Sequence, residues 1–219
     1  MSHTSTLTRA DDTLRALLRP DAPAMSLPKL ALLVALCGAF QGAMMGSYAL
    51  FNGGSALFMV WAAFKVPLFL GIAAALCFPA LRTLYYLFGM SEQFAPTIRA
   101  LAAAQAAFAA ILAAMAPFTL VFYASGLSYR GALILNLSLF ALAGLAAQNV
   151  ARGRLQSLLK RESRHFKLWS IGFAMWAFVA VQLAWNLRPF IGSPDVAVQF
   201  LRPDAFSNVY LALWKILFG

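Results

Sequence analysis

Residues 27–51 read LPKLALLVALCGAFQGAMMGSYALF, a run that is apolar apart from Lys29 and a few uncharged polar side chains. An α-helix needs about 20 predominantly apolar residues to cross the ~30 Å hydrocarbon core of a bilayer. Because that core holds no water to hydrogen-bond the backbone, a helix is the natural way to satisfy the peptide groups there. The run therefore predicts a transmembrane helix.

Four more runs of the same kind follow. The predicted spans are residues 27–51, 55–79, 97–123, 131–151 and 169–187. Mean hydropathy is +0.76 and only 11% of the residues are charged, unlike an ordinary soluble domain. We predict an all-α, polytopic membrane helix bundle of five transmembrane helices. No gap between spans is long enough for a separate domain, so residues 27–190 form one membrane domain.

Two segments flank this domain. Residues 1–26 are expected to be a cytoplasmic segment with a short amphipathic helix over Thr13–Arg19, which either lies on the inner leaflet or holds a cytoplasmic partner. Residues 191–219 are expected to be an exterior tail. Its apolar end, Phe206–Phe218, is too short to span and is expected to form a C-terminal interfacial helix. The alternative is a helix docked onto a partner subunit.

Lys and Arg residues are unevenly shared between the two sides of the predicted bundle. Twelve lie on the side of the N-terminus and four on the other. The positive-inside rule then places the N-terminus in the cytoplasm and the C-terminus outside, and the alanine-rich composition suggests a bacterial cytoplasmic (inner) membrane. Anionic lipid headgroups account for the net charge of +10, so no nucleic-acid partner is predicted. The residues expected to contact headgroups or a partner are Arg152, Arg154, Lys160, Arg161, Arg164, Lys167 and Arg188.

Small residues recur at intervals of four in two spans. Gly38, Gly42 and Gly46 form a doubled G-x-x-x-G ridge in the first span, and Ala106 and Ala110 belong to a similar ridge in the third. Such ridges let helix backbones approach closely in a membrane. The two ridges are expected to pack together within the chain, to form a homodimer or to receive another subunit.

One charge lies deep in a predicted span. Lys65 is about ten residues from either end of the second span, two residues before Pro67, and no Asp or Glu lies in any span. A mid-span lysine costs roughly 2.5–3.5 kcal/mol and is by default a functional-site hypothesis. Gln41, at similar depth, is its expected partner within the chain. The alternative is a structural lysine satisfied by carbonyls that Pro67 frees, while Pro79 is expected to end the span.

The chain shows no recognisable catalytic set. It has no phosphate-binding loop, H-E-x-x-H or G-x-S-x-G motif. The spans hold no histidine or acid, and the two cysteines give no metal-binding spacing. We therefore predict that the protein is not an enzyme and binds no cofactor or metal.

The order of features resembles the Yip1-type family of five-span membrane proteins. The resemblance lies in Lys65-Val66-Pro67-Leu68, in the Pro79 and Gly89 that follow, and in Ala116-Pro117 of the third span. It covers residues 28–190 and implies a membrane adaptor that works with other membrane proteins, with no catalytic residue to carry over.

Two functions follow as expectations. The first is a non-enzymatic integral membrane scaffold or accessory subunit of a larger membrane protein assembly, with membrane lipids, other subunits or a second copy as partners. The second is a small channel or permease subunit in which Lys65 meets a passing anion or polar headgroup near the bilayer midplane.

Overall fold

The structure is a computed structural model that describes residues 12–13, 15–17, 19, 25–161, 163–188, 190–192 and 198–201. Regular secondary structure in these residues is entirely helical. The helices are α2 (Leu27–Gly46), α3 (Tyr48–Phe51), α4 (Leu57–Leu87), the 3-10 turn η1 (Ser91–Gln93), α5 (Phe94–Ala124), α6 (Tyr129–Arg161) and α7 (Ser163–Leu187).

Five stretches of the described chain are long and apolar enough to cross a membrane. This confirms the predicted all-α architecture and is what an integral membrane protein requires. The predicted interfacial helix, Phe206–Phe218, lies outside the described residues. Short helical pieces at 12–13 and 15–17 fall within the predicted N-terminal helix.

Pro79 does not end the helix that contains the second predicted span. Both Pro67 and Pro79 lie inside α4, which continues to Leu87. A proline removes one helical hydrogen bond, whereas leaving the helix in hydrocarbon would expose several backbone groups without partners. The helix therefore continues past Pro79, where Thr83 Oγ1 donates to the Pro79 carbonyl at 3.0 Å.

Glycine lets the chain turn where two of the long helices end. Gly89 follows α4 with φ +70° and Gly126 follows α5 with φ +78°, the left-handed region that a side chain disfavours. After Gly89 the Met90 N–H donates to the Tyr85 carbonyl at 2.8 Å, which satisfies one of the last carbonyls of α4. These turns reverse the chain tightly and keep successive helices antiparallel.

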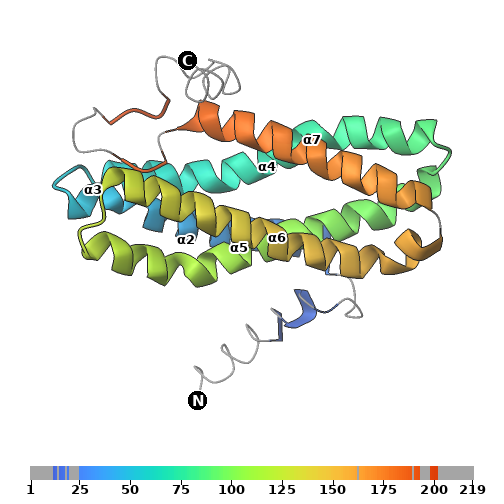
Figure 1. The fold of residues 1–219 in the computed structure, drawn as a ribbon, viewed down its shortest axis with the longest axis horizontal. Coiled ribbons are helices and arrows are strands. Elements are labelled where there is room, and N and C mark those ends of the chain that lie inside the picture. The colour runs from blue at the N-terminus through green and yellow to red at the C-terminus, as the bar shows by residue number, and fades with distance from the viewer. Residues whose placement is uncertain are drawn as a thin grey trace.

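The helix α2 is the centre of the arrangement. It packs on α4 along one side and on α5 along another, so the consecutive helices α4 and α5 scarcely touch. Outside them, α7 packs on α4 and α6 packs on α5, with little contact between α6 and α7. The long helices thus form an open arc in the order α6, α5, α2, α4, α7 (Figure 1).

The glycine ridge of α2 lies against the backbone of α4. A Cβ added at Gly42 would lie 2.7 Å from the Ala62 carbonyl carbon, and one at Gly46 would lie 2.5 Å from the Phe58 oxygen. The neighbouring atoms are backbone, which cannot yield as a flexible side chain would. This face of α2 is therefore occupied within the chain by α4.

The alanine ridge of α5 faces a different side of α2. Ala106 and Ala110 are buried with Leu30 of α2 in one apolar cluster. The two small-residue ridges thus do not meet each other, and α2 uses separate faces for its two neighbours.

We expect Gly42→Ala to lower the free energy of unfolding by about 1–3 kcal/mol, because the added methyl group overpacks a backbone contact. The measurement is unfolding in a denaturing detergent titration, followed by circular dichroism. Gly71→Ala is the matched control, since Gly71 lies in the same pair of helices with nothing within 4 Å of an added Cβ. If the two variants are equally stable, the close α2–α4 contact does not exist.

Candidate functional site

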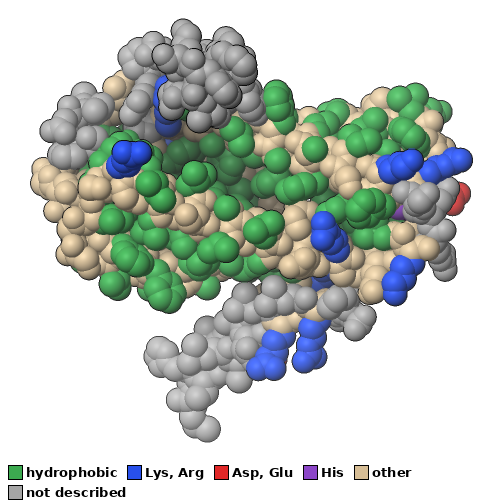
Figure 2. All heavy atoms as spheres, viewed as in Figure 1, with side chains coloured by type: hydrophobic (Ala, Val, Ile, Leu, Met, Phe, Trp, Pro, Cys, Tyr) green, Lys and Arg blue, Asp and Glu red, His purple; other side chains and the backbone are tan. Residues whose placement is uncertain are grey.

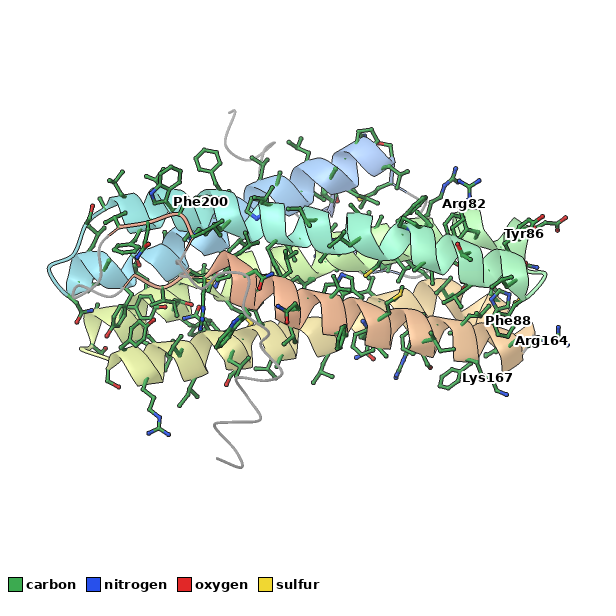
Figure 3. The ribbon with its side chains drawn as sticks, turned by 90° about the horizontal axis from the view of Figure 1, so that it is seen from above. Arg82, Tyr86, Phe88, Arg164, Lys167 and Phe200 are labelled. Atoms are coloured by element: carbon green, nitrogen blue, oxygen red, sulfur yellow. The ribbon has the colours of Figure 1, made fainter. Side chains whose placement is uncertain are left out.

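Lys65 is fully enclosed by the chain. Its side chain is 0% exposed, and its Nζ lies 4.9 Å from the centre of the Phe200 ring. Phe200 belongs to the tail segment and lies beside α4 (Figure 3). A cation over an aromatic face recovers ~0.5–2 kcal/mol, which offsets part of the cost of an intramembrane ammonium.

The described pieces of the tail fold back onto α4. Phe200 contacts Trp61 edge to face with ring centres 5.2 Å apart, and Phe190 contacts Phe69 in the same way at 6.3 Å. Ile191 is buried in the main apolar cluster. The tail therefore covers the same half of α4 that carries Lys65.

Gln41 is placed at the level of Lys65. In α2, Gly38 and Gly42 flank Gln41, and in α4, Ala62 and Pro67 flank Lys65. Gly38 lies against Pro67, and Gly42 lies against Ala62. Gln41 is also 0% exposed, yet neither its amide nitrogen nor its amide oxygen has a hydrogen-bond partner. The expected Gln41–Lys65 hydrogen bond is therefore not formed, although the two residues share one depth.

Several basic residues, two of them from the predicted set, lie toward one end of the bundle. Arg82, Arg164 and Lys167 lie together at that end in Figure 3, and Figure 2 shows blue side chains there beside an apolar middle. Lys160 of α6 is exposed. The side chain of Arg161 lies outside the described residues.

Three predicted headgroup contacts instead touch the chain itself. The Arg152 guanidinium lies over the Trp169 ring at 4.7 Å, and Arg188, at the other end, lies over Trp185 at 3.4 Å. Arg154 donates from one Nη to the carbonyls of Ala16 and Leu17, at 2.8 and 3.1 Å.

The Arg154 contact docks the helical piece at residues 15–17 on the bundle. Leu17 is 0% exposed and lies in the apolar cluster that contains Ala106 and Val150. Carbonyls at a helix C-terminus lack helical partners and carry partial negative charge, which suits a guanidinium. The structure thus gives this segment a place against α5 and α6.

A cavity that sequence reasoning missed lies between α4, α5, α6 and α7. It has a volume of about 170 Å³, and no charged residue is among its lining residues. Two glycines, Gly144 of α6 and Gly172 of α7, form part of its wall. The polar and aromatic residues of the wall include Tyr85, Thr97, Gln105, Gln148, Trp169 and Trp176.

Some of these polar groups are satisfied and others are not. Thr97 Oγ1 lies 3.2 Å from Tyr85 Oη and donates to the Gln93 carbonyl at 2.8 Å. Gln105 donates from Nε2 to the Leu70 carbonyl at 2.6 Å. By contrast, the Trp169 Nε1–H and the Gln148 Oε1 are buried with no hydrogen-bond partner.

A second cavity, of about 330 Å³, lies on the other side of Gln105. Its wall is formed by the first half of α2, by Pro67 and Gly71 of α4, and by Ala102 and Gln105 of α5. Ala102 and Gln105 line both cavities. The Gln105–Leu70 hydrogen bond therefore lies at the boundary between them.

Sequence reasoning had one usable signal for the first cavity. Gln105 and Gln148 are polar residues inside apolar runs, a pattern that typically indicates hydrogen bonds between transmembrane helices. Which helices those residues face depends on α2 separating α4 from α5, and no local pattern encodes that. In the described residues no group of His, Cys, Asp and Glu could hold a metal ion.

No protein-family model, curated protein or solved structure matches this chain. The resemblance to the Yip1-type family therefore stays a prediction.

We expect Arg154→Met to release the helical piece at residues 15–17, because the carbonyls of Ala16 and Leu17 lose their donor. The amides around residue 17 should exchange with deuterium at least about tenfold faster, since a charge-assisted hydrogen bond contributes ~1.5–3 kcal/mol. Lys160→Met is the control, because it removes the same charge from an exposed position of α6. Unchanged exchange in Arg154→Met would show that the segment is held by other contacts.

Proposed function

We propose that the protein is a non-enzymatic integral membrane scaffold or accessory subunit of a larger membrane protein assembly. We place it in a bacterial cytoplasmic membrane, with the N-terminus in the cytoplasm and the C-terminus outside. The basic end of the bundle supports this orientation, because Lys and Arg favour the cytoplasmic side and contact its anionic lipids.

The observation that carries the proposal is the incomplete packing of α6 and α7. Each packs chiefly on one neighbour, and they make little contact with each other. The face that they form is hollowed between hydrophobic side chains (Figure 2). In a bundle that functions as a monomer, α6 and α7 would be expected to pack against each other. In a subunit that receives a partner's transmembrane helix, the space between α6 and α7 would stay open for that helix.

The glycine ridge of α2 is excluded as the partner surface. Gly38, Gly42 and Gly46 contact α4 and are not available to a partner. As on the other long helices, exposed apolar side chains recur along α6, here at Leu133, Ile134, Leu137, Leu142 and Leu145. We therefore assign the partner contact to α6 and α7.

Site-specific photo-crosslinking in the native membrane tests this assignment. A photoreactive residue at Leu137 of α6 or Val181 of α7 should crosslink to the same membrane protein. The same probe at Leu36 of α2 is the control, because Leu36 is 61% exposed on a helix whose packing faces are occupied. Crosslinks to lipid alone, or equal yields at all three positions, would contradict the proposal.

The second candidate function is a small channel or permease subunit, and it is favoured by Lys65, a charged residue enclosed within the candidate membrane helix α4. Among the described tail residues, Phe200 lies over Lys65 and also contacts Trp61 of α4. A passing anion or polar headgroup would reach the ammonium only after the tail moves. This candidate therefore demands a conformational step that the scaffold does not.

Lys65→Met separates the two functions. If Lys65 is structural, we expect the variant to fold and to be at least as stable as the wild type, because it no longer carries the cost of an intramembrane charge. If Lys65 serves transport, wild-type protein in vesicles should release chloride and the variant should not. Lys29→Met is the control for charge loss at an exposed site.

A further inference from the structure

At the basic end of the bundle, α4 and α5 extend beyond the start of α2. Leu30, in the first turn of α2, lies in one apolar cluster with Ala103 and Ala106 of α5. Ala103 is the tenth residue of α5, so roughly 14 Å of α5 precedes its contact with α2. Figure 3 shows α2 stopping short of the end of α4 at which Arg82 lies. This stretch of α4 and α5 therefore lacks α2 as a neighbour.

The second cavity lies beside the first half of α2 and next to this stretch. Its volume is about 330 Å³, and all three helices of its wall belong to candidate membrane spans. Leu27, Ala31 and Gly71 of the wall are exposed, so the cavity reaches the surface of the bundle. Gln105 is the one polar residue among those that line it, and its amide donates to the Leu70 carbonyl at 2.6 Å. Such a wall suits a hydrocarbon chain and disfavours a charged group.

The volume agrees with part of an acyl chain. An engineered apolar cavity of ~150 Å³ accommodates benzene, so on the same scale about 330 Å³ accommodates roughly a dozen carbon atoms. A helix of a partner protein is about 10 Å across, and this volume would accommodate no more than about one turn of it. The cavity is therefore suited to a lipid and not to a partner's transmembrane helix.

Two arginines extend the faces of α4 and α5 that form this wall. Arg99 precedes the wall residue Ala102 by three positions and precedes Ala103, which packs with α2, by four. Arg82 follows the wall residue Gly71 by eleven positions, about three helical turns, and so lies on the same face of α4. In Figure 3, Arg82 lies on the side of α4 on which α2 lies, beyond the end of α2.

A buried hydrogen bond relates the depths of the two arginines. Thr97 Oγ1 of α5 lies 3.2 Å from Tyr85 Oη of α4. Because α4 and α5 are antiparallel, Arg99 is two residues farther from the basic end than Thr97, and Arg82 is three residues farther than Tyr85. These steps are about 3 and 4.5 Å, so the two arginines start within about one helical turn of the same depth. Both are exposed, and neither forms an ion pair with a residue that the structure describes.

We propose that this groove binds one anionic glycerophospholipid, with an acyl chain in the second cavity and the phosphate at Arg82 and Arg99. Guanidinium groups donate charge-assisted hydrogen bonds to phosphate oxygens, and two of them complement a headgroup that keeps a net negative charge. The lipid occupies the space that the shorter α2 leaves beside α4 and α5. This site goes beyond the general attraction of basic residues for anionic lipid, because it has one occupant and a defined position.

The headgroup is tested by native mass spectrometry of the full-length protein in detergent. The two probes are dioleoyl phosphatidylglycerol and dioleoyl phosphatidylcholine, which share their chains and differ in net charge. We expect one molecule of the anionic lipid to bind about tenfold more tightly than the zwitterionic one. Equal binding of the two probes, or no binding, would overturn the proposal. Inorganic phosphate should not displace the lipid beyond the effect of sodium chloride at equal ionic strength, and displacement would contradict a lipid site.

A double variant assigns the phosphate contact. Replacing both arginines, Arg82→Gln with Arg99→Gln, should weaken binding of the anionic lipid about 25-fold, about fivefold for each arginine, and remove the preference for it. The matched control is Arg130→Gln, which removes the same charge from an exposed position at the start of α6, at the other end of the bundle. If the double variant keeps the preference, or the control loses it equally, the phosphate does not lie at these arginines and the proposal fails.

Filling the cavity tests the position of the chain. Gly71→Phe should weaken binding at least about tenfold, whereas Gly71→Ala should bind as the wild type, because nothing lies within 4 Å of a Cβ added at Gly71. Circular dichroism and gel filtration check folding, and Ala35→Phe fills the same cavity from α2 if Gly71→Phe does not fold. Undiminished binding by a folded, filled variant would overturn the proposal. The scaffold proposal would stand in that case, because it is judged by crosslinks to a membrane protein.

Discussion

The close contact between the backbones of α2 and α4 is the constraint on which the rest of the arrangement depends. In hydrocarbon no hydrophobic effect draws helices together, so their association relies on van der Waals contact and interhelical hydrogen bonds. Gly42 and Gly46 allow that contact because the carbonyls of Ala62 and Phe58 occupy the space that side chains would fill. With α2 fixed on α4, its remaining apolar side meets the alanines of α5. The result is a helix wedged between two that are consecutive in the chain.

Polar groups in the interior fall into two kinds. Asn136 donates to Tyr123 Oη and to the Ala132 carbonyl at 2.8 Å, an arrangement that joins α6 to the end of α5. Gln105 joins α5 to α4 through the Leu70 carbonyl. Such bonds hold helices that apolar contact alone would leave loosely paired. Gln41, Gln148 and Trp169 retain buried atoms without partners, and each such atom costs the folded state ~1–3 kcal/mol.

The number and type of the long helices could be read from the sequence, because hydrocarbon admits few other structures. The ends of the helices could not be predicted from the sequence. For example, α4 continues through Pro79, because losing one hydrogen bond to a proline costs less than leaving the backbone groups of a whole turn without partners in lipid. Lys65 and Gln41 were predicted at one depth, and they lie at one depth. The cover over Lys65 was not predictable, because Phe200 lies far along the chain and its contact depends on how the tail returns. The contact of Arg154 with the carbonyls of Ala16 and Leu17 was not predictable either, because in the sequence Arg154 looks like any other arginine at the membrane interface.

The side chain of Gln105 has a consequence for the volume inside the bundle. Gln105 lies at the boundary between the two cavities, one of about 170 Å³ and one of about 330 Å³. Ala102 is the one other residue that lines both cavities. Side chains of this length turn about single bonds within nanoseconds when no hydrogen bond restrains them. The hydrogen bond to the Leu70 carbonyl therefore restrains the one long polar side chain that both cavities share in their walls, and with it the separation of the two volumes.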